Sequence, residues 1–429
     1  LWRAASGSPR PGRRCRAGGP ATRRSPLAPG AEWREGAVSL RVLFAGGGTG
    51  GHLTPALAIA EELRRRDPAV EVLLVGTGRA VDRRLLPDSG FPHRFLEAPF
   101  LYRVSPWRNA TVPFRFGRAL GEARRIVTEF RPHVAVGTGG YVSAPVLVAA
   151  RLAGIPVALQ EQNAAPGITN RWLGRIADEV YLNFPESRAF FPERARVLVT
   201  GNPITINGRP PDRQALRARW GIDEGRGTWM VMGGSQGARR LNEVVVELLR
   251  RHGPGFPYNL FFQTGREHHA EVLRGLGGTP PRGVLVQPFF TPMKEVYPLL
   301  DLIVSRAGAM TLSELTCWGI PAVLVPYPHA TDRHQERNAR AMAEDQAAVW
   351  LPESELTVET LGEKVELLME DHGIRESIAE RARRRGRREA AREIADRIER
   401  LAARPPARRG AATQRAAGVG AAAPEEDGP

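Results

Sequence analysis

The chain has 429 residues, a formal net charge of +15 and two cysteines. Its length suits two ordinary domains that each bury a core. Cys15 and Cys317 stand far apart in the sequence, which argues against a disulfide scaffold. The sequence has no uninterrupted apolar run of about 20 residues, so we expect no membrane-spanning helix.

The positive charge does not indicate a nucleic-acid partner. Lys294 and Lys364 are the only lysines, so arginine supplies nearly all of the basic charge. Residues 1–37 hold eight arginines and two glutamates, which puts much of the excess outside the patterned part of the chain. No helix-turn-helix, zinc-knuckle or ribonucleoprotein sequence accompanies the charge, so we expect no binding of DNA or RNA.

Residues 1–37 are rich in Gly, Pro, Arg and Ser and show little periodicity. Such a composition cannot bury a core, and the segment lacks the apolar region of a secretory signal. We interpret residues 1–37 as a disordered or mis-called N-terminal extension, with the true start near Val38.

The run Leu40–Leu63 is the most informative stretch of the chain. A predicted strand at residues 41–44 leads into Gly46-Gly-Gly-Thr-Gly-Gly-His52, and a helix follows with Pro55 expected in its first turn. Glycines allow a tight turn, and a helix N-terminus offers N–H groups to phosphate. His52 stands where a proton acceptor would lie beside that phosphate. A tight turn without a ligand, and a histidine that caps its own helix, are the alternatives.

The same strand, loop and helix pattern occurs three more times. The predicted strands cover residues 134–136, 228–232 and 302–304, and the helices after the first two cover residues 142–152 and 243–251. The third helix begins near Ala309, with Thr311 and Ser313 as expected caps. Four such units predict an α/β protein with parallel sheets, built as two nucleotide-type domains facing a shared cleft.

Further strands are expected at residues 71–75, 156–159, 260–263, 284–286 and 322–325. We expect a first domain over residues 38–200 and a second over 201–369, joined at Gly201-Asn-Pro203. Residues 370–402 follow as a C-terminal helical segment, with one long helix over 375–402. Residues 403–429 are rich in Ala, Gly and Pro and are expected to be a disordered tail.

With these motifs in order, residues 40–400 resemble the MurG family. The resemblance rests on the first glycine loop, Gly137-Thr-Gly-Gly-Tyr141, Gln160-Glu-Gln-Asn163, Gly201-Asn-Pro203, Gly233-Gly-Ser-Gln-Gly-Ala238, Ser305-Arg-Ala-Gly-Ala-Met-Thr-Leu-Ser-Glu314 and His334-Gln335. It implies a GT-B fold, in which two Rossmann-like domains face a cleft and the last helix packs back on the first domain. It also implies an inverting transferase that moves N-acetylglucosamine from UDP-N-acetylglucosamine to the 4-hydroxyl of the muramoyl sugar of undecaprenyl-diphospho-N-acetylmuramoyl-pentapeptide, converting lipid I to lipid II in peptidoglycan synthesis.

The resemblance assigns the donor to a defined set of residues. Ser235 would contact the diphosphate, Glu314 both ribose hydroxyls, Asn163 and Gln335 the sugar, and the backbone of Phe290 the uracil. The remaining donor contacts are Thr49, Gly50, Gly51, Ala309, Met310, Thr311, Leu312 and Ser313. A helix cap at Ser235, a solvated acid at Glu314 and an ordinary turn at Asn163 are the alternatives.

The acceptor also carries a diphosphate, which the resemblance assigns to the two glycine loops of the first domain. Its contacts would be Gly47, Gly48, Thr49, Gly50, Gly51, Thr138, Gly139, Gly140 and Tyr141, with His52 as general base. We assign no metal ligand and expect no cofactor; metal dependence stays open, as no Asp-x-Asp motif occurs. The family often has a basic residue after Gly-Asn-Pro, where this chain has Thr205, with Arg209 nearby.

An aromatic and basic segment predicts contact with lipid. Trp107, Phe114, Arg115 and Phe116 suit a patch on an anionic membrane surface, and buried core aromatics are the alternative. With the resemblance, this places the protein peripherally on the cytoplasmic face of the bacterial plasma membrane. The rival functions are a GT-B glycosyltransferase for another lipid or a natural-product acceptor, and a module that binds a UDP-sugar without turnover.

Overall fold

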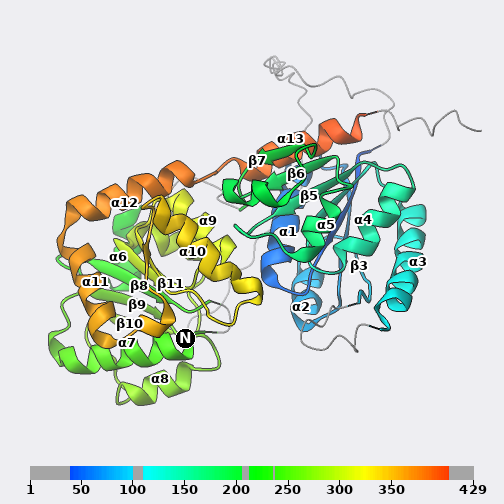
Figure 1. Cartoon of the computed structure of the whole chain (residues 1–429). Coiled ribbons are helices and arrows are strands. Elements are labelled where there is room, and N and C mark those ends of the chain that lie inside the picture. Colours follow the sequence, from blue (N-terminus) through cyan, green and yellow to red (C-terminus); the bar gives the residue numbers. More distant parts are fainter. Residues whose placement is uncertain (1–38, 100–109, 205–211, 235–236, 405–429) are drawn as a thin grey trace, which may run out of the picture. The chain divides into compact units, whose positions relative to one another are not determined.

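The computed structural model describes residues 39–99, 110–204, 212–234 and 237–404. Residues from Leu40 onward form a compact unit of their own. The described part of this unit contains two sheets, one of seven strands and one of six, and every pairing is parallel (Figure 1). The predicted α/β class with two Rossmann-like halves is therefore confirmed.

The first sheet has the strand order β3-β2-β1-β4-β5-β6-β7. Its strands are β1 (Arg41–Gly46), β2 (Glu71–Gly76), β3 (His93–Phe95), β4 (Val134–Gly139), β5 (Val157–Glu161), β6 (Glu179–Leu182) and β7 (Val197–Val199). Its helices are α1 (Gly50–Arg66), α2 (Ala80–Asp88), α3 (Val112–Phe130), α4 (Ser143–Leu152) and α5 (Ile168–Leu173). After Arg41, β1 is apolar and buried because helices cover both faces of the sheet. α1 and α2 share one core with it, and α3, α4 and α5 share the other.

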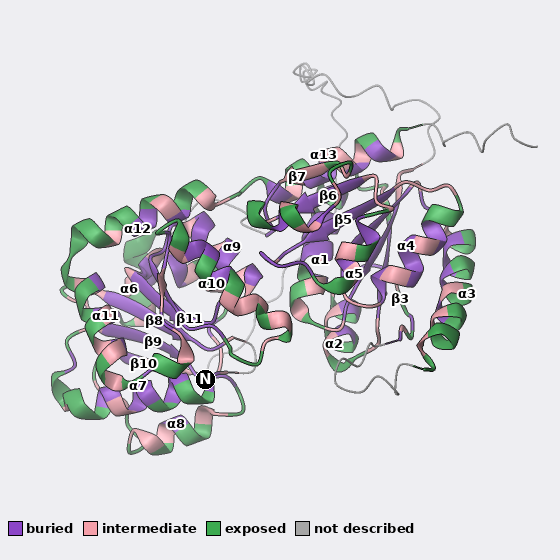
Figure 2. Cartoon of the chain, viewed as in Figure 1, coloured by how far each residue is buried: buried purple, intermediate pink, exposed green. Residues whose placement is uncertain are grey.

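The second sheet has the order β10-β9-β8-β11-β12-β13. Its strands are β8 (Thr228–Met232), β9 (Asn259–Gln263), β10 (Val284–Gln287), β11 (Leu302–Ser305), β12 (Ala322–Leu324) and β13 (Val349–Trp350). The helices are α6 (Arg213–Trp220), α7 (Arg239–His252), α8 (His269–Gly275), α9 (Ala309–Trp318), α10 (His334–Glu344), α11 (Val358–Glu370), α12 (His372–Arg385) and α13 (Ala390–Ala402). Figure 2 shows the strands of both sheets buried and the outward sides of the helices exposed.

The long helix predicted over residues 375–402 is wrong, because the chain forms two helices there, α12 and α13. α12 ends at Gly386, where an added Cβ would lie 2.7 Å from the carbonyl oxygen of Thr316 in α9. The link then passes Gly201, whose Cβ position lies 2.4 Å from Cβ of Arg387. The segment between α12 and α13 therefore lies close to α9 and to the predicted junction Gly201-Asn-Pro203.

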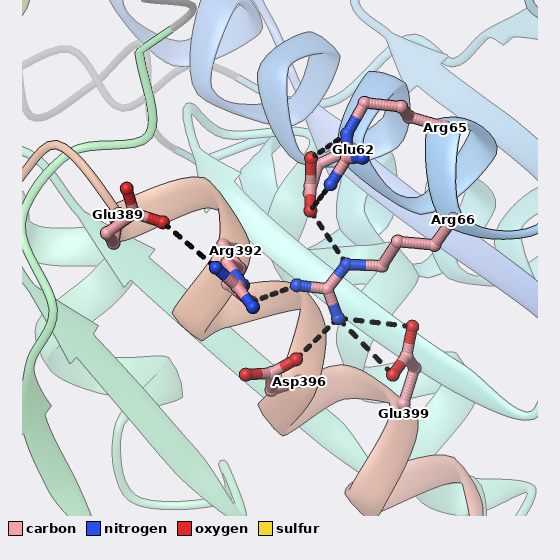
Figure 3. A network of polar contacts seen from close by, with 7 residues as sticks. All are labelled: Glu62, Arg65, Arg66, Glu389, Arg392, Asp396 and Glu399. Carbon is pink, nitrogen blue, oxygen red and sulfur yellow. Dashed lines mark hydrogen bonds and ion pairs between the residues drawn. The ribbon is translucent and has the colours of Figure 1, made fainter. Parts of the chain in front are cut away.

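α13 packs against the first sheet. Ile394, Ile398 and Leu401 are fully buried in the core that α1 and β1 share. A polar network lies beside this contact (Figure 3): Arg66 of α1 donates to Asp396 at 2.5 Å and to the carbonyl oxygen of Arg392 at 2.7 Å. The C-terminal helix is thus held to α1 by apolar burial and by charge-assisted hydrogen bonds.

The sequence analysis missed the short strands β3, β6, β7 and β13, which have few residues over which a pattern can repeat. It also placed Pro55 too early, since α1 begins at Gly50 and Pro55 lies in its second turn. Short 3₁₀ turns occupy Pro185–Phe190, Gly253–Gly255, Met293–Glu295, Tyr297–Leu299, Thr331–Arg333 and Glu353–Glu355. Among the described residues, no helix has the length and apolar character needed to cross a membrane.

Candidate functional site

A cleft of about 1710 Å³ lies at the loops that follow β1, β4, β8 and β11. Ligands of parallel α/β sheets bind at the carboxyl ends of the strands, where these loops are. The predicted site residues that line this cleft are Gly47, Gly48, Thr49, Gly50, Gly51, His52, Arg115, Gly139, Gly140, Tyr141, Asn163, Ala309, Met310, Thr311 and Gln335. The structure thus brings most of the predicted set to one place.

The first glycine loop leads into α1, which begins at Gly50. The N–H groups of Gly50 and Gly51 therefore have no partner within the helix and line the cleft. Gly48 is different, because its N–H donates to both carboxylate oxygens of Asp82, at 2.9 and 3.0 Å. The expectation that Gly48 offers its amide to a phosphate is corrected: an internal carboxylate holds that N–H.

The second glycine loop packs directly on the first. Gly140 has φ +81°, and a Cβ there would lie 2.5 Å from the carbonyl oxygen of Gly47. Gly139 has φ +107°, and a Cβ there would lie 2.6 Å from Cδ2 of the His52 ring. Only glycine fits either position, because each combines a left-handed backbone with a close neighbour.

Thr138 is fully buried and does not line the cleft, contrary to expectation. Its hydroxyl donates to the carbonyl oxygen of His52 at 2.7 Å. The side chain thus fixes the start of α1 from within the fold instead of contacting a ligand.

His52 lies in the first turn of α1. Its Nδ1 lies 3.0 Å from Oγ1 of Thr49 and 3.3 Å from the carbonyl oxygen of Gly47. A carbonyl only accepts hydrogen bonds, so the contact with Gly47 is a hydrogen bond only in the tautomer that has the proton on Nδ1 and the lone pair on Nε2. The hydroxyl of Thr49 can donate or accept, so its contact fits either tautomer. Burial lowers the pKa of His52, and the ring is therefore neutral at pH 7.

The segment after β5 fixes Asn163. The N–H of Asn163 donates to Oε1 of Glu161 at 2.9 Å, and Asn338 of α10 donates to Oδ1 of Asn163 at 3.2 Å. Burial raises the pKa of Glu161. Oδ1 of Asn338 also accepts the N–H of Ala164 at 2.9 Å. Asn163 is thus oriented by neighbours from both halves of the described unit.

α9 presents a helix N-terminus to the cleft. Its first turn, Ala309, Met310 and Thr311, lines the cleft, and no side chain caps it at Gly308. The expected caps from Thr311 and Ser313 are therefore wrong. Ser313 is buried, donates to the carbonyl oxygen of Ala309 at 2.9 Å and accepts from Asn202 at 2.9 Å.

Leu312 is also buried, at 2% exposed, and neither Leu312 nor Ser313 lines the cleft. Leu312 and Ser313 lie on the side of α9 that faces the protein interior. The helix therefore offers its first turn to the cleft, and not the whole predicted stretch.

Glu314 and Phe290 also lie outside the lining of the cleft. Oε2 of Glu314 accepts the hydroxyl of Tyr297 at 2.5 Å, and burial raises the pKa of Glu314. The N–H of Phe290 donates to Oε1 of Gln263 at 3.1 Å. Both predicted donor contacts therefore have internal partners here.

Gln335 does line the cleft, and its Oε1 accepts the N–H of Tyr327 at 3.0 Å. This bond fixes the amide oxygen and leaves the Nε2 donors to face a ligand. Four residues named from the sequence, Trp107, Thr205, Arg209 and Ser235, lie outside the described residues.

Several cleft residues were missed as functional groups. Arg306 is 8% exposed, donates to the carbonyl oxygens of Val325 and Pro326 at 3.1 and 3.2 Å, and pairs with Glu353. Arg306 belongs to the motif Ser305–Glu314 that the sequence analysis gives for the resemblance. Its position between a strand and a helix N-terminus could have marked it as a site residue. His334 also lines the cleft, and burial lowers its pKa.

The predicted lipid patch is described only over its helical part. Phe114 in the first turn of α3 is 79% exposed, and Phe116 is half-buried. Arg115 is exposed and lines the cleft. The alternative of an ordinary core aromatic is thus excluded for Phe114.

A cleft lined by helix N-termini from two parallel α/β halves is the arrangement of the GT-B fold, the fold of one class of glycosyltransferases. Family models agree with this class. Residues 42–182 match the glycosyltransferase family 28 N-terminal domain, and residues 228–398 match the glycosyltransferase family 28 C-terminal domain. Within the described residues, no group of three or more His, Cys, Asp or Glu is placed to hold a metal ion.

The relatives narrow the class further. A protein of Desulforudis audaxviator named UDP-N-acetylglucosamine–N-acetylmuramyl-(pentapeptide) pyrophosphoryl-undecaprenol N-acetylglucosamine transferase is 42% identical over 340 residues, which cover 77% of this chain and 90% of that protein. A protein of the same name from Moorella thermoacetica is 41% identical over 322 residues, covering 74% and 87%. The crystal structure of Acinetobacter baumannii MurG matches with a TM-score of 0.69 at 31% identity, covering 85% of this chain and 100% of that one. The chain belongs to the MurG family.

Proposed function

We propose that this enzyme transfers N-acetylglucosamine from UDP-N-acetylglucosamine to the muramoyl sugar of the undecaprenyl-diphosphate-linked pentapeptide acceptor. The observation that carries the proposal is the pair of helix N-termini, α1 and α9, that line one cleft. Donor and acceptor each carry a diphosphate, and each diphosphate needs unpaired N–H groups. The names of the relatives support this substrate pair.

On the donor side, the first turn of α9 and the loop over residues 233–238 hold the diphosphate of UDP. Negative charge grows on that diphosphate as the bond to the sugar breaks, and fixed N–H groups stabilise it. Asn163 and Gln335 supply amide groups to the sugar hydroxyls. The expected contacts of Glu314 to ribose and of Phe290 to uracil require these two residues to exchange their internal partners, Tyr297 and Gln263, for the donor.

On the acceptor side, the N-terminus of α1 holds the lipid-linked diphosphate. His52 takes the proton of the muramoyl 4-hydroxyl on Nε2 while Nδ1–H stays bonded to the carbonyl oxygen of Gly47. The hydroxyl oxygen attacks the anomeric carbon from the face opposite UDP, so the configuration inverts. This division makes residues 38–200 the acceptor domain and residues 201–369 the donor domain.

The membrane-bound acceptor requires an approach to lipid. We assign this to the start of α3, where Phe114 is exposed beside Arg115 and Arg118. An apolar side chain beside cations suits an anionic surface. The enzyme would then work peripherally at the cytoplasmic face of the plasma membrane, with Phe116 in the same patch.

The test is transfer of radiolabelled N-acetylglucosamine from its UDP form to a short-chain analogue of the lipid acceptor. The expected result is labelled disaccharide lipid from the native enzyme and none from a heat-treated control. Transfer to a lipid or natural-product acceptor without a diphosphate, with none to the analogue, would contradict the proposal. UDP-sugar binding with no transfer to any acceptor would favour a binding module.

A further inference from the structure

Asp82 is a buried carboxylate beside the first glycine loop. It lies in the first turn of α2 and is 0% exposed. Its Oδ2 accepts the N–H and the hydroxyl of Thr77 at 2.7 and 2.6 Å, and both of its oxygens accept the N–H of Gly48. Within the described part of the chain, these bonding partners are neutral donors and none is a cation.

Burying such a carboxylate costs desolvation free energy. Its desolvation is offset only by the hydrogen bonds that it accepts, and apolar residues of similar volume often stabilise a fold equally well. Stability alone therefore does not explain the position of Asp82. A second role follows from His52, which lies at the other end of the peptide group that joins Gly47 and Gly48.

Asp82 and His52 bind opposite ends of one peptide group. The N–H of Gly48 and the carbonyl of Gly47 belong to the same planar unit and point in opposite directions. The N–H end donates to Asp82, and the carbonyl end lies 3.3 Å from Nδ1 of His52. Hydrogen bonds at the two ends of a peptide polarise each other. A carboxylate is thus linked to the imidazole through a single peptide plane.

The packing holds this arrangement from both sides. A Cβ at Gly47 would lie 2.6 Å from Oδ2 of Asp82, so the carboxylate lies directly against the peptide. The ring of His52 lies against Gly139, where a Cβ would be 2.6 Å from Cδ2. Neither Gly47 nor Gly139 therefore has room for a side chain in this arrangement.

We propose that Asp82 is a positioning residue for the transfer: through the peptide between Gly47 and Gly48 it holds His52 with Nδ1 protonated and Nε2 open to the reacting hydroxyl. The inference rests on the proposed role of His52 as base. The proton of the hydroxyl moves to Nε2, and Nδ1 keeps its own proton.

The charges around His52 predict in which direction its pKa should move when Asp82 is replaced. Burial lowers the pKa of His52, His334 of α10 lowers it further, and the charge of Asp82 acts in the raising direction. Removing the charge of Asp82 should therefore lower the pKa of His52. The acid limb of the kcat profile, which reports the neutral base, should then move to lower pH.

The test is Asp82→Asn in the full chain. We expect kcat to fall about 10- to 100-fold, since a small misplacement of a catalytic group has that effect. The KM for UDP-N-acetylglucosamine should not change, and the acid limb should move to lower pH. Asp178→Asn is the matched control: Asp178, which directly precedes β6, also accepts a backbone N–H, that of Val157 at 2.8 Å, and does not line the cleft. It should keep both kcat and the acid limb.

A double-mutant cycle separates this inference from the proposed function. If Asp82 acts through His52, adding Asp82→Asn to His52→Ala should cause no further loss. An equal loss in both backgrounds would show a merely structural role and overturn the inference. If His52→Ala abolishes turnover while Asp82→Asn changes neither kcat nor the acid limb, the inference alone is overturned. Unchanged turnover in His52→Ala would overturn the proposed base as well.

A measurement on the native chain covers the case in which Asp82→Asn does not fold. Long-range nitrogen–proton NMR spectra of labelled histidine distinguish the two neutral tautomers. We expect His52 in the tautomer with Nδ1 protonated, and the Nε2-protonated form would overturn the inference. Thr77→Val, which removes one hydrogen bond to Asp82, should give a smaller loss of kcat in the same direction.

Discussion

The two loops that lead into the helix N-termini of the cleft are held differently. At α1 the loop is clamped: Asp82 holds the N–H of Gly48, Thr138 holds the carbonyl oxygen of His52, and the second glycine loop packs on Gly47. At α9 no side chain caps the first turn, which begins at Ala309. Both helices keep unpaired N–H groups in their first turn, but only the half that carries the proposed base also fixes the preceding loop with buried polar groups. A base needs a fixed direction, whereas a departing diphosphate needs unpaired donors.

The largest effect should come from the clamped half. His52→Ala should lower kcat by about 10²- to 10⁴-fold, because general base catalysis contributes roughly that much. Binding of UDP, which we assign to the other half, should be unchanged in calorimetry. If the variant loses both UDP binding and turnover, the assignment of the base and of UDP binding to different halves is wrong.

The open half is tested by removing one N–H without breaking the helix. Ala309 is the first residue of α9, a position that accepts proline. Ala309→Pro should lower kcat/KM for UDP-N-acetylglucosamine by about 10²-fold, since one lost donor at a developing charge costs that much.

Gly50→Pro is the matched variant at the first position of α1, and a Cβ there meets nothing within 4 Å. It should raise the KM for the acceptor about 10-fold, as expected for one lost hydrogen bond to a charged group, and leave the donor KM unchanged. Steady-state kinetics with each substrate varied in turn measures both. If the two variants affect the same substrate, the division between the halves is wrong.

The pH dependence sharpens the account of the clamped half. Because burial lowers the pKa of His52, the neutral base should persist below the ordinary histidine value of about 6.5. The acid limb of the kcat profile should therefore have its midpoint below about 6.5. A midpoint above that value would mean that a neighbouring negative charge outweighs burial, or that another group titrates.

The smallest effect concerns Ser313. Its hydroxyl is bonded to Ala309 and Asn202 and does not line the cleft. Ser313→Ala should lower the free energy of unfolding by about 1 kcal/mol and leave UDP affinity unchanged. Thermal unfolding and calorimetry on the same sample would show whether the residue is structural or binds the donor.

The sequence predicts the sheets better than the site. Apolar runs such as β8 were found with their observed bounds, because a strand covered on both faces leaves a continuous signal. The α12 and α13 helices were merged, because the contact of Gly386 with α9 is a tertiary event that the local charge pattern does not record.

Within the site, glycine loops and helix starts are local patterns and could be predicted. The inward turn of Thr138 and Ser313, and the partners of Glu314 and Phe290, depend on distant residues and could not. The clamp by Asp82 was missed for the same reason, since 34 residues separate it from Gly48.

The most direct measurement of the division between the two halves is a crystal structure with UDP bound. The account predicts the diphosphate within hydrogen-bond distance of the N–H groups of Ala309, Met310 and Thr311, with Gly50 and Gly51 free of it. A diphosphate seated on Gly50 and Gly51 instead, with the first turn of α9 empty, would contradict it.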